Sequence, residues 1–375
     1  MELSAEDALR LNVLLANELQ AVRIDESGMS LYGLSPRGES RVKLNPNCRD
    51  ETYVRRIREM LSSHVLGSPG GYPIYLRRWT RMGQARDDSL DKLLLLGEPE
   101  AVVAVVHAPG LSDELARRAW WAMPTADNAR KMLTREAVCK GEMGPVLAQY
   151  LIDYLPFEED HHAMIESVRL VLQPGLIDAG MRERIWAKAR SKNTYYVGFL
   201  LATPDALPEP APAHPVWATA AEPLRALADA GNAYACRLCR VLDVPGQAFM
   251  ATVETVIRKP NNQDVVVALF EAIRAYFQDV ACPGVRLQDI ETIGQQADSR
   301  CRDCAAQDAQ LAELLARLPE LSPVLRAMLV LSAVGERLVA PVFARTDAIG
   351  TVMRRKLEPI TQPLLAEIAV LRGAG

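Results

Sequence analysis

PGLSDELARRAWWAMPTADN (residues 109–128) and PGLIDAGMRERIWAKARSKN (residues 174–193) are two copies of one motif, 65 positions apart. Eight of the twenty aligned positions are identical, far more than chance gives. Each copy follows an apolar helix end, stops it with Pro-Gly, and places an acid, Asp113 or Asp178, in the first turn of the next helix. This pattern is typical of stacked helical hairpins in α-solenoids, and two copies predict a short stack over residues 91–203.

The repeat also makes predictions about single side chains. Trp121 and Trp186 follow the two acids at the same spacing, so we expect them in equivalent buried sites on equivalent helices. Asn128 and Asn193 end the two copies, and asparagine is a common N-cap residue. We therefore expect these asparagines to cap the helices that follow.

The first 90 residues combine helix and strand patterns. Ser4 can cap a first helix, because acids and then apolar residues at helical spacing follow it. Residues 21–34 alternate around a Ser-Gly turn, which predicts a β-hairpin, and residues 41–47 resemble a third strand. Residues 48–66 return to helical spacing. We predict a small α+β domain over residues 1–90 with a short antiparallel sheet.

A proline-rich stretch divides the rest of the chain. TPDALPEPAPAHPV (Thr203–Val216) contains five prolines in fourteen residues, so it cannot be a helix and predicts a linker over residues 204–216. The remainder, residues 217–375, predicts an all-α bundle. Its expected helices are Pro223–Asp243, Gln247–Arg258, Asn262–Val280, Leu287–Leu318, Val324–Val339 and a last segment over Val342–Leu371.

Composition sets the class of protein. The chain has 375 residues, of which 49% are hydrophobic and 24% charged, as in ordinary globular proteins. The net charge of −4 gives no general attraction to nucleic acid or to anionic membranes. The start is acidic, unlike a signal peptide, and no apolar run is long enough to span a bilayer. We expect a mainly α, cytoplasmic protein that does not bind membranes.

Two CxxC pairs, CRLC (Cys236–Cys239) and CRDC (Cys301–Cys304), are the strongest chemical signal. Four cysteines could bind a structural zinc ion, although both pairs are expected inside helices rather than on turns. A redox or sulfur-handling pair needs a lowered thiol pKa, and the first pair is expected about three turns into its helix. Cysteine is also a common buried apolar residue, and the second pair falls on a heptad-like seam. We favour this structural role, with no cofactor, over zinc binding or redox chemistry.

A second candidate site is GSPGGYPIYLRRWTRMGQAR, residues 67–86. Its glycines and prolines predict an irregular loop, followed by a cluster of basic and aromatic side chains that could bind an anion or RNA: Arg77, Arg78, Trp79, Arg81 and Arg86. No Walker-type lysine follows, which argues against a nucleotide loop. The simpler alternative is that the arginines pair with neighbouring acids such as Asp87 and Asp88.

Several strings in the chain resemble the DsrS family. They are MELSAEDALRLNVLLAN, HVLGSPGGYPIYLRRWTRMGQ, LLLLGEPEAVVAVVHAPGL and ARRAWWAMP, and the resemblance is strongest over roughly the first 180 residues. The resemblance implies a cytoplasmic accessory or regulatory protein associated with the dsr gene cluster of sulfur-oxidising bacteria. It implies no reaction and transfers no catalytic residues.

The common catalytic signatures are missing from the sequence. It contains no G-x-S-x-G, no G-x-G-x-x-G and no HExxH motif, so a binding function is favoured over an enzymatic one. The leading hypothesis is a non-enzymatic scaffold or regulator that binds another protein. The alternatives are a CxxC-based thiol or sulfur-handling protein and an RNA-binding regulator that uses the loop at residues 67–86.

Overall fold

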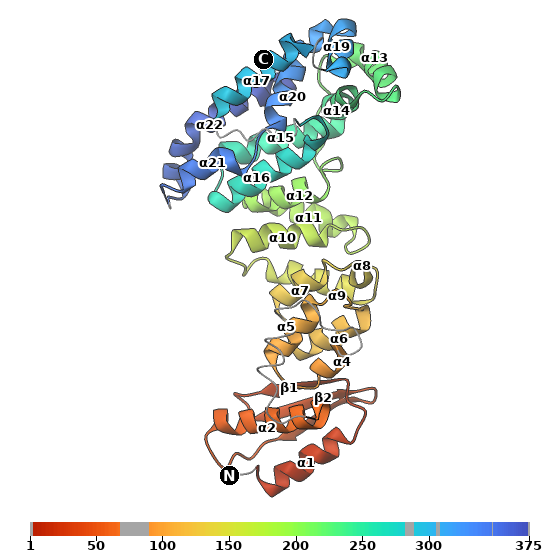
Figure 1. Cartoon of the computed structure of the whole chain (residues 1–375), viewed down its shortest axis with the longest axis vertical. Coiled ribbons are helices and arrows are strands. Elements are labelled where there is room, and N and C mark those ends of the chain that lie inside the picture. The colour runs from red at the N-terminus through yellow and green to blue at the C-terminus, as the bar shows by residue number, and fades with distance from the viewer. Residues whose placement is uncertain (1–2, 68–89, 282–288, 305–307, 347, 374–375) are drawn as a thin grey trace. The chain divides into compact units, whose positions relative to one another are not determined.

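The computed structural model describes residues 3–67, 90–281, 289–304, 308–346 and 348–373 (Figure 1). These residues are mainly helical, with a three-stranded antiparallel sheet near the N-terminus, so the predicted mainly α class is confirmed. The chain divides into two compact units. The first unit comprises Met1–Pro156 with Pro174–Leu176, and the second unit comprises Phe157–Gln173 with Ile177–Gly375.

The sheet of the first unit has the strand order β1 (Ala21–Asp25), β2 (Ser30–Ser35), β3 (Gly38–Lys43). All neighbouring strands are antiparallel, as the predicted hairpin and third strand require. Val22 pairs with Gly33 and Leu31 pairs with Val42, which places the side chains of this row on one face. A Cβ at Gly33 would meet Leu14 of the first helix at 3.2 Å and Leu19, which follows that helix, at 3.0 Å, so glycine lets this part of the chain approach the sheet.

Helices α1 (Ala5–Leu15) and α2 (Asp50–Leu66) share an apolar core with the sheet. Ser4 caps α1 as predicted, since its side chain accepts a hydrogen bond from the Asp7 backbone N–H. Asp7 is fully buried in this core. Its Oδ2 accepts hydrogen bonds from the Tyr53 hydroxyl at 2.5 Å and from the Asn45 backbone at 2.7 Å. The carboxylate therefore joins α1 to α2 and to the segment after β3.

The first unit also contains a series of short helices (Figure 1). They are α4 (Leu90–Leu93), α5 (Pro99–His107), α6 (Asp113–Ala122), α7 (Ala126–Met132), α8 (Glu136–Cys139) and α9 (Met143–Tyr154). Helix α6 lies against β1, on the face of the sheet that carries Arg23 and Tyr32. The Arg23 guanidinium stacks over the Tyr32 ring at 4.7 Å and over the Trp121 ring at 5.0 Å. This row of cation–π contacts attaches α6 to the sheet.

The regular secondary structure of the second unit is entirely helical among its described residues. Its elements are α10 (His161–Val171), α11 (Ala179–Ala189), α12 (Asn193–Ala202), α13 (Trp217–Asp229), α14 (Ala233–Leu242), α15 (Val244–Arg258), α16 (Gln263–Tyr276), η2 (Gln278–Val280), α17 (Ile290–Arg302), α19 (Ala309–Arg317), η3 (Pro319–Leu321), α20 (Ser322–Ser332), α21 (Glu336–Phe343) and α22 (Gly350–Leu371). Helix α16 lies within the predicted helix Asn262–Val280, and one of its faces is buried from Val265 to Tyr276. The proline-rich stretch Thr203–Val216 contains no helix and lies within this unit.

The sequence repeat corresponds to the helix order α5–α6–α7 and α10–α11–α12, and the two sets belong to different units. Their first turns differ. Ser112 caps α6, whereas Asp178 itself caps α11 by accepting from a backbone N–H three residues on at 2.6 Å. Asp113 instead accepts from the Met143 backbone N–H at 3.1 Å, so it stabilises the start of α9. The acid at this repeated position therefore has a different structural role in each copy.

The predicted asparagine caps are wrong. Thr125 caps α7, and Asn128 lies buried inside that helix, where its amide donates to the Met123 carbonyl at 2.9 Å. Asn193 is the first residue of α12, and its amide donates to the Lys259 carbonyl at 2.7 Å. Asn128 thus bonds the end of the preceding helix, and Asn193 bonds a carbonyl 66 residues away, so neither side chain serves as an N-cap.

The two tryptophans do not occupy equivalent sites, contrary to the prediction. Trp186 is 6% exposed and packs edge-on against the Tyr196 ring at 4.8 Å. Trp121 is only half-buried, and its ring nitrogen donates to Glu39 at 2.8 Å at the edge of the sheet. The first copy lies beside a β-sheet and the second does not, so identical residues meet different neighbours.

Three predicted helices are each broken. Val324–Val339 contains most of α20, which ends at Ser332, and the start of α21, which begins at Glu336. Pro223–Asp243 contains the end of α13 and all of α14, because Gly231 adopts a φ of +89° and Asn232 caps α14 through the Ala235 backbone N–H at 3.1 Å. Within Leu287–Leu318, α17 ends at Arg302 and Asp308 caps α19. The heptad-like seam expected for the second CxxC pair therefore does not run along one continuous helix. No helix in the described ranges is both long enough and apolar enough to cross a membrane.

Candidate functional site

The first CxxC pair lies near the start of α14. Cys236 is the fourth residue of this helix and is exposed, whereas Cys239, one turn further, is half-buried. Cys236 Sγ lies 3.6 Å from the Ala228 carbonyl oxygen of α13, which accepts its weak hydrogen bond. Burial and the neighbouring Cys236 raise the pKa of the Cys239 thiol. The expected position three turns into a helix is wrong, because the break at Gly231 creates a new helix start just before the pair.

The second pair lies at a helix C-terminus rather than near a helix N-terminus. Cys301 is half-buried in the last turn of α17, and Cys304 is buried just beyond that helix. Burial and the neighbouring Cys304 raise the pKa of the Cys301 thiol. A helix C-terminus disfavours an adjacent negative charge, which also works against a thiolate here.

The described residues do not join the two pairs into a metal-binding group. Within the described ranges, no group of three or more His, Cys, Asp or Glu side chains is arranged to hold a metal ion. Besides burial, the pKa of Cys239 is raised by Cys236, and the pKa of Cys301 is raised by Cys304, so the only cysteine that contributes to each shift is the one of the same pair. The four-cysteine zinc site therefore gains no geometric support from the described residues.

The predicted arginine loop cannot be placed. Residues 68–89 lie outside the described residues, and this range includes the whole predicted anion or RNA site: Arg77, Arg78, Trp79, Arg81 and Arg86. The RNA-binding hypothesis for this loop stays a prediction.

The two arginines of CRLCR form a cluster that the sequence reading missed. Arg237 and Arg240 place their guanidinium carbons 5.2 and 4.6 Å from the centre of the Tyr276 ring on α16. Arg237 is 5% exposed and pairs with Asp279, and Arg240 pairs with Asp205 in the proline-rich stretch. Burial raises the pKa of the Tyr276 hydroxyl well above its usual range. The cluster attaches α14 to α16 and to residues 203–216, and the spacing of three between the arginines was its only local signal.

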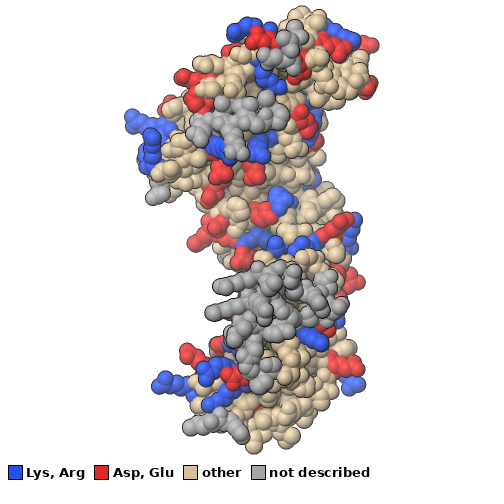
Figure 2. All heavy atoms as spheres, in the orientation of Figure 1, with Lys and Arg blue, Asp and Glu red and all other residues tan. Residues whose placement is uncertain are grey.

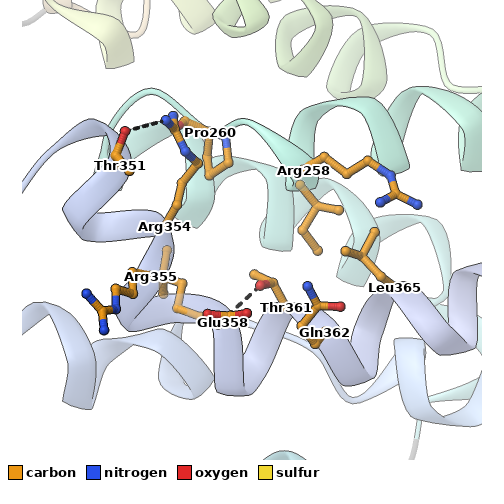
Figure 3. A pocket seen from close by; sticks show the side chains of 11 residues that line it. Arg258, Pro260, Thr351, Arg354, Arg355, Glu358, Thr361, Gln362 and Leu365 are labelled. Atoms are coloured by element: carbon orange, nitrogen blue, oxygen red, sulfur yellow. Dashed lines mark hydrogen bonds between the residues drawn. The ribbon is translucent and has the colours of Figure 1, made fainter.

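A groove of about 340 Å³ lies between the end of α15 and α22 (Figure 3). We call it the α15–α22 groove. Its lining combines aliphatic, hydroxyl, amide and charged side chains: Ile257, Arg258, Pro260, Thr351, Arg354, Arg355, Leu357, Glu358, Thr361, Gln362 and Leu365. Three arginines face one glutamate, so the lining carries net positive charge.

The three arginines differ in how firmly they are held. Arg354 donates to the Thr351 hydroxyl at 2.9 Å and to the Pro260 carbonyl at 3.4 Å (Figure 3). Arg258 donates to Glu254 on its own helix. Arg355 is exposed and has no hydrogen bond or ion pair within the described part of the chain. The groove therefore combines two oriented guanidinium groups with one that is unpaired.

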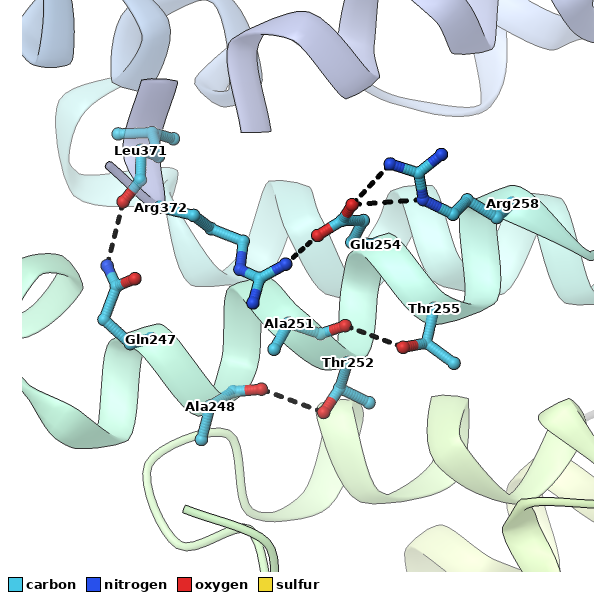
Figure 4. Close-up of polar contacts among 9 residues, drawn as sticks. All are labelled: Gln247, Ala248, Ala251, Thr252, Glu254, Thr255, Arg258, Leu371 and Arg372. Carbon is cyan, nitrogen blue, oxygen red and sulfur yellow. Dashed lines mark hydrogen bonds and ion pairs between the residues drawn. The ribbon is translucent and has the colours of Figure 1, made fainter. Parts of the chain in front are cut away.

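The wall of α15 next to the groove is anchored to the end of α22 (Figure 4). Glu254 pairs with Arg258 on one oxygen and with Arg372 on the other. Although burial opposes it, the hydrogen bonds from these two arginines lower the pKa of Glu254. Gln247 donates to the Leu371 carbonyl at 2.8 Å. These contacts join α15 to the C-terminal end of α22, the two helices that form the groove.

Basic side chains extend beyond the groove along α22. Arg354, Arg355 and Lys356 are consecutive, and the last two are exposed. Figure 2 shows Lys and Arg side chains gathered where Figure 1 places α22. Ile349 and Val352, at the start of this helix, are 70% and 58% exposed. The surface beside the groove therefore joins positive charge to exposed apolar side chains.

One carboxyl in the first unit has a strongly shifted pKa. Glu98 lies at the start of α5, and its side chain is 12% exposed. Burial raises its pKa to about 7, even though Arg58 lies 3.1 Å away and favours the charged form. Arg58 is shared with Glu26 at 2.7 Å and with the Gly97 carbonyl, so its attraction is divided. Glu98 therefore links the start of α5 to Arg58 of α2, and its low exposure argues against an open site.

The fold and the groove together define a mainly α-helical protein with a basic, partly apolar groove. Comparisons with protein-family models, curated proteins and solved structures found no match to this chain.

Proposed function

We propose that this protein is a non-enzymatic accessory protein that binds an acidic segment of a partner protein in the α15–α22 groove. The observation that carries the proposal is the groove lining, which combines three arginines with aliphatic side chains. Carboxylates are the natural partners of guanidinium groups, and the aliphatic residues can bury an apolar side chain between them.

The ionisable groups of the groove favour binding over catalysis. Its lining contributes arginines and Glu358 as the charged groups. Arginine keeps its proton in proteins, so it cannot serve as a general base, and Glu358 is exposed. The hydroxyl of Thr361 donates to the Leu357 carbonyl at 3.2 Å rather than to a base. Such a lining recognises charge and shape without activating a nucleophile.

A protein partner fits the groove better than a nucleic acid. Sites for single-stranded nucleic acid pair basic grooves with aromatic side chains that stack on bases. The described lining contains aliphatic rather than aromatic residues, with Ile257, Leu357 and Leu365 as its apolar part. Helical proteins of this kind commonly bind peptides in such grooves. The resemblance to the DsrS family adds the expectation that the partner takes part in cytoplasmic sulfur oxidation.

A selection from random short peptides tests the proposal without assuming a partner. The purified full chain should enrich peptides rich in Asp and Glu around an apolar residue, and their affinity should fall as salt rises. Arg355→Glu removes one attraction and adds a repulsion, so it should weaken the selected peptides about tenfold. Arg337→Glu is the matched control, because Arg337 is exposed on α21 and does not line the groove.

Three results would count against this function. The first is the absence of acidic enrichment in peptides selected by the wild-type chain. The second is equal weakening by Arg337→Glu and Arg355→Glu, which would show that the effect is one of general charge. The third comes from a parallel selection with single-stranded RNA. Tighter RNA binding that is lost in Arg355→Glu would replace the protein partner with a nucleic acid.

A further inference from the structure

The α14 cysteines have the spacing of a dithiol that can close. Cys236 and Cys239 are three residues apart in one helix. Ideal helix geometry places such Cα atoms about 5 Å apart, and disulfides span Cα distances of about 4.4–6.8 Å. The two side chains lie on neighbouring positions of one helix face, which is the face toward α13. Closure therefore needs a local adjustment within a single helical turn.

The two thiols differ in access. Cys236 is exposed and lies in the turn after the Asn232 cap, so a reagent from solution can reach its sulfur. Cys239 is half-buried, and burial raises the pKa of its thiol. In a thiol–disulfide exchange site the accessible thiol attacks first, and the less accessible one completes the reaction from within the protein.

The charges around the pair come from two helices. Arg225 of α13 favours the thiolate of Cys239, whereas Asp229 of the same helix disfavours it. Arg237 and Arg240 of α14 are engaged at Tyr276 with their own acids. The pair is therefore left on the α13 side of α14, apart from the arginine cluster.

We propose that Cys236 and Cys239 form a reversible dithiol–disulfide site that reacts with low-molecular-weight disulfides. The Cys236 thiolate attacks one sulfur of the small disulfide, forms a mixed disulfide and releases one small thiolate. The Cys239 thiolate then attacks Cys236 Sγ, forms the protein disulfide and releases the second small thiolate. The two protons lost by the cysteines pass to the two released thiolates. The protein dithiol is oxidised by two electrons, and the small disulfide is reduced to two thiols.

The second CxxC pair is a built-in control. Cys301 is half-buried at the end of α17, and Cys304 is 8% exposed, so neither matches the accessible thiol of the first pair. Both pairs also read Cys-Arg-x-Cys, with Arg237 and Arg302 after the first cysteine. Trypsin cuts after arginine, so a disulfide within either pair appears as two linked peptides. The same measurement therefore reads both pairs in one sample.

The experiment treats the reduced, native full chain with glutathione disulfide, blocks free thiols at intervals and maps the tryptic peptides by mass spectrometry. The Cys236–Cys239 link should form at least about tenfold faster than the Cys301–Cys304 link. In urea the two pairs should react at similar rates, because their local sequences match. Cys239→Ser should trap glutathione on Cys236 as a stable mixed disulfide. Cys236→Ser should leave Cys239 unmodified over the same time.

Equal rates at the two pairs in the native protein would overturn the proposal, as would faster closure of Cys301–Cys304. Failure of Cys239→Ser to accumulate a mixed disulfide at Cys236 would also overturn it, provided that far-UV circular dichroism shows the variant folded. The Cys236→Ser protein gives the second readout: rapid capture of glutathione by Cys239 would reverse the assigned roles and refute them. The peptide selection described above uses other residues, so the two proposals fail independently.

Discussion

Gly198 lies in the middle of α12, where that helix packs against α10. A Cβ added at this position would lie 2.6 Å from both Cβ and Cγ1 of Val168, and 3.1 Å from the Ile165 carbonyl oxygen. Carbon atoms normally approach no closer than about 3.5–4.0 Å. The Val168 Cβ cannot rotate away, so Gly198→Ala forces α10 and α12 apart.

Two free-energy contributions of opposite sign determine how much Gly198→Ala changes the stability of the second unit. Alanine in a helix interior is favoured over glycine by about 1 kcal/mol. Overpacking a buried contact of this kind costs roughly 3 kcal/mol, toward the upper end of the usual range, because two carbons clash and one is fixed. We expect Gly198→Ala to destabilise the second unit by about 2 kcal/mol, which is roughly a 30-fold change in an opening equilibrium.

Gly180→Ala is the matched control. Gly180 is exposed near the start of α11, and its added Cβ would meet one Asp178 oxygen at 3.5 Å. The same substitution should therefore keep the helix-propensity gain and raise stability by about 0.5–1 kcal/mol. Hydrogen exchange of peptides from α10 and α12 is the appropriate assay, because it localises an opening to one unit. If Gly198→Ala leaves exchange in these helices unchanged or slower, the inferred helix contact is wrong.

Three further predictions follow from the packing of single side chains. Trp186→Ala should lower the free energy of unfolding by about 3–5 kcal/mol and Trp121→Ala by clearly less, because only the first ring is fully buried; equal losses in urea unfolding would contradict this. Burial raises the pKa of Glu98 to about 7 from an ordinary 4.5, so the folded state binds the extra proton and stability should fall by at most about 3 kcal/mol, less any solvent screening, as pH rises from roughly 5 to 8. Glu98→Gln should abolish that slope in urea unfolding at several pH values, and an unchanged slope would refute the assignment. Tyr53→Phe removes a donor from the buried Asp7 carboxylate and should cost about 2–3 kcal/mol, whereas an unaltered urea midpoint would show that the hydrogen bond contributes little.

Local patterns were enough for much of the secondary structure. Alternation around a Ser-Gly turn identified the hairpin that the structure contains as β1 and β2, and Ser4 caps the first helix as expected. These features depend on residues within one turn or one hairpin, which a sequence pattern records directly. The candidate groove could not be predicted from such local patterns. The groove is lined by α15 and by α22, about a hundred residues later in the chain, and neither segment has a distinctive motif.

The position of the first CxxC pair could not be predicted from local sequence alone. A single helix through residues 223–243 was compatible with the apolar spacing, and Gly231 is tolerated inside helices at modest cost. The structure instead uses Gly231 to end α13 and Asn232 to begin α14, which moves Cys236 from a helix interior to a helix start. This helix start is also stabilised by a residue far along the sequence, because the Asn232 amide donates to the Gln310 carbonyl at 2.7 Å.

By itself the sequence determined that this protein is mainly helical, that a small antiparallel sheet lies near its N-terminus, and that one helix order occurs twice. Only the tertiary structure decided which identical residues have different environments, such as Trp121 on a sheet and Trp186 in an aromatic cluster. It also decided which cysteine is accessible and which arginines line a groove. The physical reason is the separation along the sequence over which each kind of interaction acts. Helix and turn preferences act over a few residues, whereas burial, ion pairs and grooves depend on neighbours that folding brings from 60 to more than 100 positions away.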